Sequence, residues 1–309
     1  MPHPGAVLLC CGLTTLDLLQ GLDRLPAPDE KVQADWALLQ VGGPAANAAL
    51  TAALLGRTTR LVTVLGAGPL ALAARSELVD TGVEVVDATP PGSPWRLPVS
   101  SVLLTGGSGA RAVVSANAAD GPTTGSVRLD LHDVDAVLVD GHHHELALAV
   151  AGAARSAGLP VLLDGGSWKP VTPALLPLVD VAVLSAAFGV PGTASDGTLA
   201  AVQRLGPAVV AQTHGPGPVR LLDADGERDI TVPAVTGVVD TLGAGDVLHG
   251  ALAALLADAV ARSGGFDRML EAAARVATLS CEFRGARGWA GSDEGRERAR
   301  AVVDAVLSG

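Results

Sequence analysis

The sequence predicts an α/β fold in which a doubly wound, mostly parallel β-sheet carries helices on both faces. Short β-branched runs alternate with alanine-rich stretches of helical period along most of the chain. The chain has 309 residues, of which 49% are hydrophobic, so it can bury a large core. This length suits one large α/β domain or two small ones.

The elements follow from the same alternation. The predicted strands cover residues 6–12, 60–66, 83–87, 134–140, 160–164, 180–184 and 207–213. The predicted helices cover residues 44–55, 70–81, 145–157, 195–205, 244–262, 267–283 and 293–307. Because most strands are followed by a helix, neighbouring strands are expected to run parallel.

Two stretches break the alternation. One is residues 31–41. The other is the pair 95–105 and 110–117, which form a hairpin signal around Gly106–Gly109 with no helix between the two strands. Together they predict a small antiparallel sheet that projects from the main body. Such a sheet beside a ligand crevice commonly serves as a lid, and an ordinary peripheral sheet is the alternative.

Charge and cysteine content narrow the class of partner and the compartment. The formal net charge of −11 argues against nucleic acid or an anionic membrane as the main partner, because both are polyanions. Small molecules are expected instead. The three cysteines cannot pair fully, which suits free thiols in a reducing cytosol. No apolar run has the length and flanks of a signal peptide or membrane span, so we expect a cytoplasmic protein.

The most informative motif runs from Asp240 to Asp246 and opens an apolar helix. Gly243, Ala244 and Gly245 would lie at the helix N-terminus, where unpaired N–H groups and the helix dipole favour an anion. Asp246, in the first turn, is either a plain cap for those N–H groups or a carboxylate available for chemistry.

Two further segments carry polar side chains near expected strand ends. Gly42 and Gly43 open an alanine-rich helix that includes Asn47, whose amide offers both a donor and an acceptor to a polyol. Asp17 follows the first predicted strand at its carboxyl end, where α/β sheets bind ligands. The alternative for each is an ordinary polar turn.

Together these segments resemble the carbohydrate kinases related to ribokinase, the PfkB family, whose signature reads D-T-x-G-A-G-D. The resemblance spans about residues 7–290. It implies one ribokinase-like kinase domain over residues 1–309, with lid strands at about 31–41 and 95–117. It also implies transfer of the γ-phosphoryl group of ATP to a hydroxyl, expected to be primary, of a sugar or sugar-like polyol. Mg²⁺ and K⁺ are the implied metal cofactors, and a homodimer through the lid is expected.

The resemblance also assigns roles to residues of this chain. Asp246 corresponds to the general base, and the backbone of Gly243, Ala244 and Gly245 to the anion hole. The residues implied in acceptor binding are Asp17, Gly42, Gly43, Asn47 and His142. The residues implied in nucleotide binding are Thr213, Gly215, Gly285 and Ala286, and Asp240 is the candidate ligand of a monovalent cation.

His142 belongs to a run of three histidines just after the predicted strand 134–140. One of them can face the crevice and contact the acceptor. A solvated loop is the alternative. A metal site is a weaker interpretation, since consecutive residues do not easily converge on one ion and no companion motif completes a ligand set.

One departure and one competing pattern leave alternatives open. The family often carries Asn-x-x-Glu after the strand that corresponds to 180–184, and residues 184–189 here contain neither residue. A catalytically weak sugar- or nucleoside-binding protein on the kinase scaffold is therefore one alternative. The other is an NAD-dependent oxidoreductase, because residues 66–71 match G-x-G-x-x-A and Asp87 lies about 20 residues further on.

Overall fold

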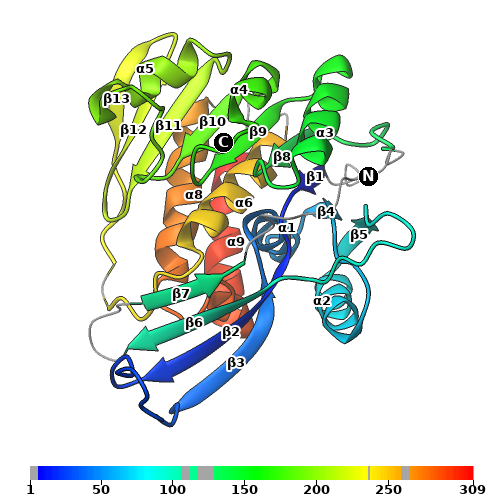
Figure 1. The fold of residues 1–309 in the computed structure, drawn as a ribbon. Helices are drawn as coiled ribbons and strands as arrows, with labels where there is room; N and C mark the ends of the chain where they lie inside the picture. The colour runs from blue at the N-terminus through cyan, green and yellow to red at the C-terminus, as the bar shows by residue number, and fades with distance from the viewer. Residues whose placement is uncertain are drawn as a thin grey trace.

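The body of the protein is built around a large β-sheet (Figure 1). The computed structural model describes residues 6–105, 111–116, 129–235, 237–258, 263 and 265–308. Within these residues the sheet has nine strands in the order β13-β12-β11-β10-β9-β8-β1-β4-β5. The strands from β5 to β11 in this order run parallel, and β12 and β13 continue the sheet as an antiparallel edge. The predicted fold class is confirmed.

The parallel strands lie close to their predicted ranges. They are β1 (Val7–Cys11), β4 (Thr58–Thr63), β5 (Val83–Asp87), β8 (Ala136–Val139), β9 (Val161–Gly165), β10 (Val181–Leu184) and β11 (Val209–His214). The edge strands β12 (Gly217–Asp223) and β13 (Gly226–Ile230) have no counterpart in the sequence prediction.

Helices cover both faces of the sheet. One face packs against α1 (Pro44–Leu54), α2 (Pro69–Asp80), α6 (Ala244–Leu256), α8 (Phe266–Ser280) and α9 (Asp293–Leu307). The other face packs against α3 (His144–Ser156), α4 (Thr172–Leu175) and α5 (Thr198–Gln203). Short 3₁₀ turns are η1 (Leu176–Leu178), η2 (Ser195–Gly197) and η3 (Gly288–Gly291). The predicted helix 244–262 ends at Leu256 as described, and residues 259–262 lie outside the described residues.

The two cores follow from the alternation of side chains along each strand. In β9, Leu162 joins the cluster under α1, α6 and α8, whereas Val161 and Leu163 join the cluster under α3. Strands buried on both faces read as nearly continuous apolar runs, which is why the periodicity identified them so well.

Helices α1 and α6 pack closely enough to bring their first turns together. A Cβ at Gly250 would lie 2.5 Å from the carbonyl oxygen of Ala48, so only glycine permits this approach. One residue earlier on α1 and one turn earlier on α6, Asn47 and Asp246 are joined by a hydrogen bond.

A second sheet projects from the body beside β1 and α1 (Figure 1). Within the described residues it has four strands in the order β3-β2-β6-β7. These are β2 (Thr15–Leu22), β3 (Trp36–Gly42), β6 (Val99–Thr105) and β7 (Arg111–Ser115). The outer pairs are antiparallel, as predicted, and the central pair β2–β6 is parallel. The predicted lid strands correspond to β3, β6 and β7, whereas β2 was not predicted. The predicted turn at Gly106–Gly109 lies outside the described residues.

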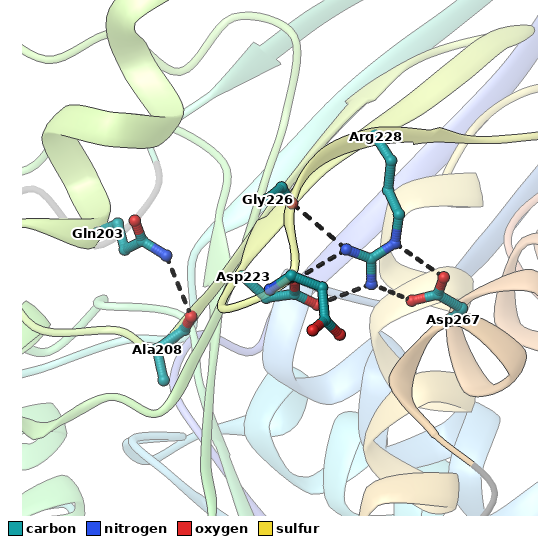
Figure 2. Close-up of polar contacts among 7 residues, drawn as sticks. Gln203, Ala208, Asp223, Gly226, Arg228 and Asp267 are labelled. Atoms are coloured by element: carbon teal, nitrogen blue, oxygen red, sulfur yellow. Dashed lines mark hydrogen bonds and ion pairs between the residues drawn. The ribbon is translucent and has the colours of Figure 1, made fainter.

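An arginine attaches the edge hairpin β12–β13 to the body. Figure 2 shows the Arg228 guanidinium between the carboxylates of Asp223, on β12, and Asp267, in the first turn of α8. Arg228 donates to Asp223 at 2.7 and 2.8 Å and to Asp267 Oδ2 at 2.8 Å. These bidentate contacts raise the pKa of Arg228 and fix the hairpin against α8.

Cys10, Cys11 and Cys281 are buried free thiols, as the sequence predicts. Among the helices described, none is long and apolar enough to span a membrane.

Candidate functional site

The site lies at the edge of the sheet beside β1, where successive strands along the chain begin to be added on the opposite side of β1. From β1, the chain runs outward through β4 and β5 on one side and later through β8 to β11 on the other. Asp140, just after β8, accepts hydrogen bonds from the backbone N–H groups of Leu13 at 2.8 Å, Ala45 at 3.2 Å and His142 at 2.8 Å. This buried carboxylate fixes the loop after β1 and the start of α1 at the crevice where α/β sheets bind ligands.

A pocket opens between the small sheet and this edge of the body. The small sheet contributes mainly polar side chains: Thr15, Asp17, Gln40, Ser100, Val113 and Ser115. The body contributes Leu13, Gly43, Pro44, Asn47, Leu242, Gly243, Asp246 and Ala286. The pocket thus brings together six of the residues predicted from the sequence: Asp17, Gly43, Asn47, Gly243, Asp246 and Ala286.

Asp246 is a pocket-lining carboxylate whose pKa is raised toward neutrality. It lies in the first turn of α6, and its Oδ2 accepts a 2.7 Å hydrogen bond from the side-chain amide of Asn47. Burial and the nearby charge of Asp164 raise the pKa of Asp246 to about 7, whereas the Asn47 hydrogen bond lowers it. A carboxylate that titrates near neutrality can accept a hydroxyl proton and release it again.

The helix start beside Asp246 is shaped by close packing. Gly243 has a φ of +73°, and a Cβ there would lie 2.4 Å from the Cβ of Ala286. A Cβ at Gly245 would meet open space, so this part of the backbone remains accessible. The Ala244 N–H lies 3.3 Å from the carbonyl oxygen of Thr241. A ligand anion at this helix start would be favoured by the dipole of α6.

Asp17 lies on β2, a strand that the sequence did not predict. Thr15 donates to its Oδ1 at 2.7 Å, and burial raises the pKa of Asp17 although that hydrogen bond lowers it. Gly42 on β3 makes room for this carboxylate, since a Cβ there would lie 2.0 Å from Oδ2. Gly42 therefore positions Asp17, and Gly43 lines the pocket.

A buried acid–histidine pair lies beneath the start of α6, and sequence reasoning missed it. His249 Nδ1 is 3.4 Å from Asp164 Oδ2, and also 2.7 Å from the carbonyl oxygen of Gly245. Its Nε2 is 3.1 Å from the carbonyl oxygen of Val183. Burial raises the pKa of Asp164, and the charge of His249 lowers it. Asp164 in turn raises the pKa of Asp246.

His142 lies beside the site rather than among the residues described as lining the pocket. It is half-buried at the end of β8, where burial lowers its pKa and Asp140 raises it. Its contact with the acceptor stays a prediction. The next residue, His143, packs edge-on against Trp95 at 6.1 Å between ring centroids. Within the described ranges, no three His, Cys, Asp or Glu side chains are grouped so that they could hold a metal ion.

The predicted nucleotide and cation residues lie at the β11–β12 turn and on two loops tied together by Asp240. Thr213 lies one residue before the end of β11, with its hydroxyl 3.3 Å from the carbonyl oxygen of Leu184, and Gly215 begins the following turn. Asp240 accepts from the N–H of Leu242 at 2.9 Å and from that of Gly285 at 2.8 Å. Asp240 thus ties the loop before α6 to the Gly285–Ala286 loop. Its cation role and the nucleotide contacts stay predictions.

Comparison with known proteins identifies the family of the chain. The family model described as pfkB family carbohydrate kinase matches residues 6–290. The chain belongs to this family of carbohydrate kinases. The pocket that Asp17 and Asp246 line from its two sides is therefore found in a carbohydrate kinase of the pfkB family.

Solved structures of similar proteins share the whole fold. A proposed ribokinase from Agrobacterium tumefaciens is 25% identical, with a TM-score of 0.82 over 99% of each chain. Ribokinase from Arabidopsis thaliana, solved with ribose and ATP, is 21% identical, with a TM-score of 0.74 over 99% of this chain and 100% of the other. Fructokinase from Xylella fastidiosa, solved with ATP, is 18% identical, with a TM-score of 0.67 over 98% of each chain.

Other pfkB kinases often carry Asn-x-x-Glu after the strand that corresponds to β10. In this chain, residues of that segment make hydrogen bonds and packing contacts within the protein. The Ser185 hydroxyl donates to the carbonyl oxygen of Gly166 at 2.8 Å. Phe188 is buried and packs edge-on against Trp168 at 5.9 Å between centroids. This position therefore supplies no carboxylate to the site.

In the dinucleotide-binding pattern, the acid that would bind a ribose is Asp87, and its carboxylate is already held by protein contacts. Asp87 Oδ1 accepts from the N–H groups of Leu65 at 3.1 Å and Thr89 at 3.0 Å, and its Oδ2 lies 2.9 Å from the guanidinium of Arg75. These contacts, together with membership of the pfkB family, set the oxidoreductase alternative aside.

Proposed function

We propose that the protein transfers the γ-phosphoryl group of ATP to a primary hydroxyl group of a sugar or sugar-like polyol. The observation that carries the proposal is the position of Asp246: at the mouth of α6, hydrogen-bonded to Asn47, and in the same pocket as Asp17. Asp246 would take the proton of the acceptor hydroxyl. The N-terminus of α6 would stabilise the negative charge of the transferring group.

The acceptor would lie between the small sheet and the body. Asp17, Ser100 and Ser115 offer hydrogen-bonding groups from one side of the pocket, and Asn47 offers its amide from the other. A polyol, with several hydroxyls that both donate and accept, suits such a lining. His142 is proposed to contact the part of a bound acceptor that reaches past Asp140.

The nucleotide would approach from the loops that follow β11 and α8. Thr213 and Gly215 would bind it from one side, and Gly285 and Ala286 from the other. For Gly285 and Ala286, the placement is supported by the hydrogen bond from the Gly285 N–H to Asp240, in the loop before α6. A K⁺ ion at Asp240 is part of the same proposal.

Magnesium would enter with the nucleotide. The described residues offer no cluster of three or more ligating side chains, and residues 184–189, where the family often carries Asn-x-x-Glu, contain neither asparagine nor glutamate. Mg²⁺ often keeps several waters and is bound largely by substrate phosphates, so a protein-built cage is not required. When bound, the ion would neutralise charge on the phosphates.

We also propose that two copies associate through the small sheet. Leu39, Leu18, Ser101 and Val114 form one row across its four strands, on the face opposite Asp17. Leu39 is 53% exposed and Val114 is 73% exposed. Exposed apolar side chains at both edges of a projecting sheet suit contact with a second copy. The cytoplasmic location stays a prediction.

The test is ADP formation from ATP with a panel of hexoses, pentoses, nucleosides and linear polyols. We expect at least one acceptor to give ADP and a phosphomonoester in equal amounts, and we expect Asp246→Asn to lower kcat about 10²-fold or more. Binding of a sugar without ADP formation would favour the binding-protein alternative that the missing Asn-x-x-Glu motif suggests. Stabilisation by NADH, but not by ATP or ADP, would contradict the kinase assignment.

A further inference from the structure

A chain of polar contacts runs from the surface of α2 to the pocket. Arg287, directly after the Gly285–Ala286 loop, is largely buried, with 12% of its side chain exposed. One terminal nitrogen donates to Asn47 Oδ1 at 2.8 Å and the other to Glu77 Oε1 at 2.5 Å. The second oxygen of Glu77 accepts from the N–H of Val41, where β3 joins α1, at 2.9 Å.

The contact with Asn47 settles which way its amide points. An amide presents an oxygen on one side and an NH₂ group on the other, and a half-turn exchanges the two. Arg287 has only donors, so it requires the oxygen on its own side. The NH₂ group is then left facing Asp246, to which it donates at 2.7 Å. In the reverse orientation an NH₂ group would face the guanidinium, and an oxygen would face the carboxylate.

We propose that Arg287 is a positioning residue for Asp246: it holds the Asn47 amide in the orientation that donates to the carboxylate. The inference rests on the proposed role of Asp246 as general base. Glu77 completes the arrangement by fixing the other end of the guanidinium. Loss of this orientation would leave Asp246 protonated to a higher pH and therefore less available as a base.

Several charged groups around Asp246 influence its pKa, so the test must separate an effect of Arg287 through Asn47 from a direct effect of its charge. Asp164 on β9 and Asp17 on β2 raise its pKa, whereas Asn47 and His249, one turn along α6, lower it. Arg287 also interacts with Asp246 through space, because the charge of Asp246 raises the Arg287 pKa while burial lowers it. An effect of Arg287 could therefore pass through Asn47 or act directly by charge.

The experiment is an NMR titration of the Asp246 side-chain carboxyl in the free protein, assigned by its absence in Asp246→Asn. Arg287→Gln and Asn47→Ala should each raise the titration midpoint by about one pH unit, because Asn47→Ala removes the donor and Arg287→Gln no longer holds that donor toward Asp246. The double variant should shift no further than Asn47→Ala alone. Arg287→Lys, which keeps the charge but lacks the planar fork, should shift the midpoint in the same direction. The matched control is Arg298→Gln, which breaks an exposed pair with Glu282 and should leave the midpoint unchanged.

Two outcomes would overturn the inference. In one, the midpoint is the same in Arg287→Gln as in the unmodified chain. In the other, removing Arg287 shifts it equally with and without Asn47, which would show a direct charge effect. If Arg287→Gln does not fold, Arg287→Lys and Glu77→Gln provide the same comparison. The titration needs neither ATP nor sugar, so a protein without kinase activity would contradict the proposed function and leave this result readable. In an active enzyme, the acidic limb of the kcat/KM profile, which reports the free enzyme, should move by the same amount.

Discussion

The amide of Asn47 on α1 donates a 2.7 Å hydrogen bond to Oδ2 of Asp246 on α6, across 199 residues of sequence. This contact joins two motifs that the sequence presents separately. It also keeps the carboxylate beside the acceptor pocket and close to the helix N-terminus. The following predictions depend on the two sides of this pocket and on the packing that shapes it.

Asp17→Asn should weaken acceptor binding more than it slows catalysis. Asp17 faces the pocket from β2 and would accept hydrogen bonds from acceptor hydroxyls. Hydrogen bonds to charged groups contribute about 1.5–3 kcal/mol, so KM for the acceptor should rise about 10-fold to 150-fold. KM for ATP should stay unchanged. Steady-state kinetics with exposed Asp23→Asn as the control checks this, and an unchanged acceptor KM would remove Asp17 from the binding site.

Gly243→Ala should destabilise the fold as well as impair the site. The backbone there has a φ of +73°, and the added Cβ would lie 2.4 Å from that of Ala286. The expected loss of unfolding free energy is about 1–3 kcal/mol, measured by urea denaturation. The control is Gly152→Ala in α3, where the added Cβ meets open space and should be neutral or slightly stabilising. Equal stability of the two variants would contradict the packing described for Gly243.

The raised pKa of Asp246 should make the stability of the folded protein depend on pH. Its pKa is raised to about 7 in the folded protein, so the folded state binds a proton that an ordinary aspartate releases near pH 4. The favourable contribution is complete below pH 4 and is lost as pH rises through about 7. Asp246→Asn should therefore gain stability relative to the unmodified chain between pH 4 and 8.

Thermal or urea unfolding across this pH range measures that difference directly. The control should show no such trend in this range. Asp133 has its pKa lowered by Arg60, so its stabilising contribution is complete above about pH 5 and is lost only as pH falls below about 4. Asp133→Asn should therefore differ from the unmodified chain by a constant amount between about pH 5 and 8. A pH-independent difference for Asp246→Asn would mean that Asp246 titrates normally.

The proposed association through the small sheet predicts a change of mass. The unmodified chain should elute with the mass of a dimer, and Val114→Lys should dissociate it, because Val114 is 73% exposed on the outer face of the sheet. Leu72→Lys, at a leucine that is 68% exposed on α2, is the matched control and should leave the dimer intact. Light scattering after gel filtration makes the comparison. A monomeric unmodified chain at micromolar concentration would argue against this interface.

Most of the body could be predicted from the sequence, because its strands are buried on both faces and its helices repeat at 3.6 residues. β2 escaped detection because only three residues separate it from β1 and because Asp17 suggested a loop. β13 escaped because Ile230 is its only fully buried apolar residue. Pairing with β12 and the contacts of Arg228 hold it in place, and neither is visible in a local pattern.

The site was predictable to the extent that its residues lie in motifs. Asp246, Asn47 and Asp17 carry a recognisable spacing of glycines and polar residues around them. Arg287 and Glu77 do not, since their contact joins residues 210 positions apart. The Asp164–His249 pair likewise forms only when β9 is placed beside α6. Such partners follow from the packing of the sheet and helices, not from local sequence.

The central claim is that Asp246 acts as the base, and a kinetic and binding comparison of Asp246→Asn tests it most directly. With the acceptor identified by the substrate panel, kcat should fall about 10²-fold or more because the hydroxyl proton has no acceptor. The dissociation constants of acceptor and ATP, measured by calorimetry, should stay close to those of the unmodified chain. Exposed Asp304→Asn on α9 should retain full activity. Turnover by Asp246→Asn close to that of the unmodified chain would contradict the account.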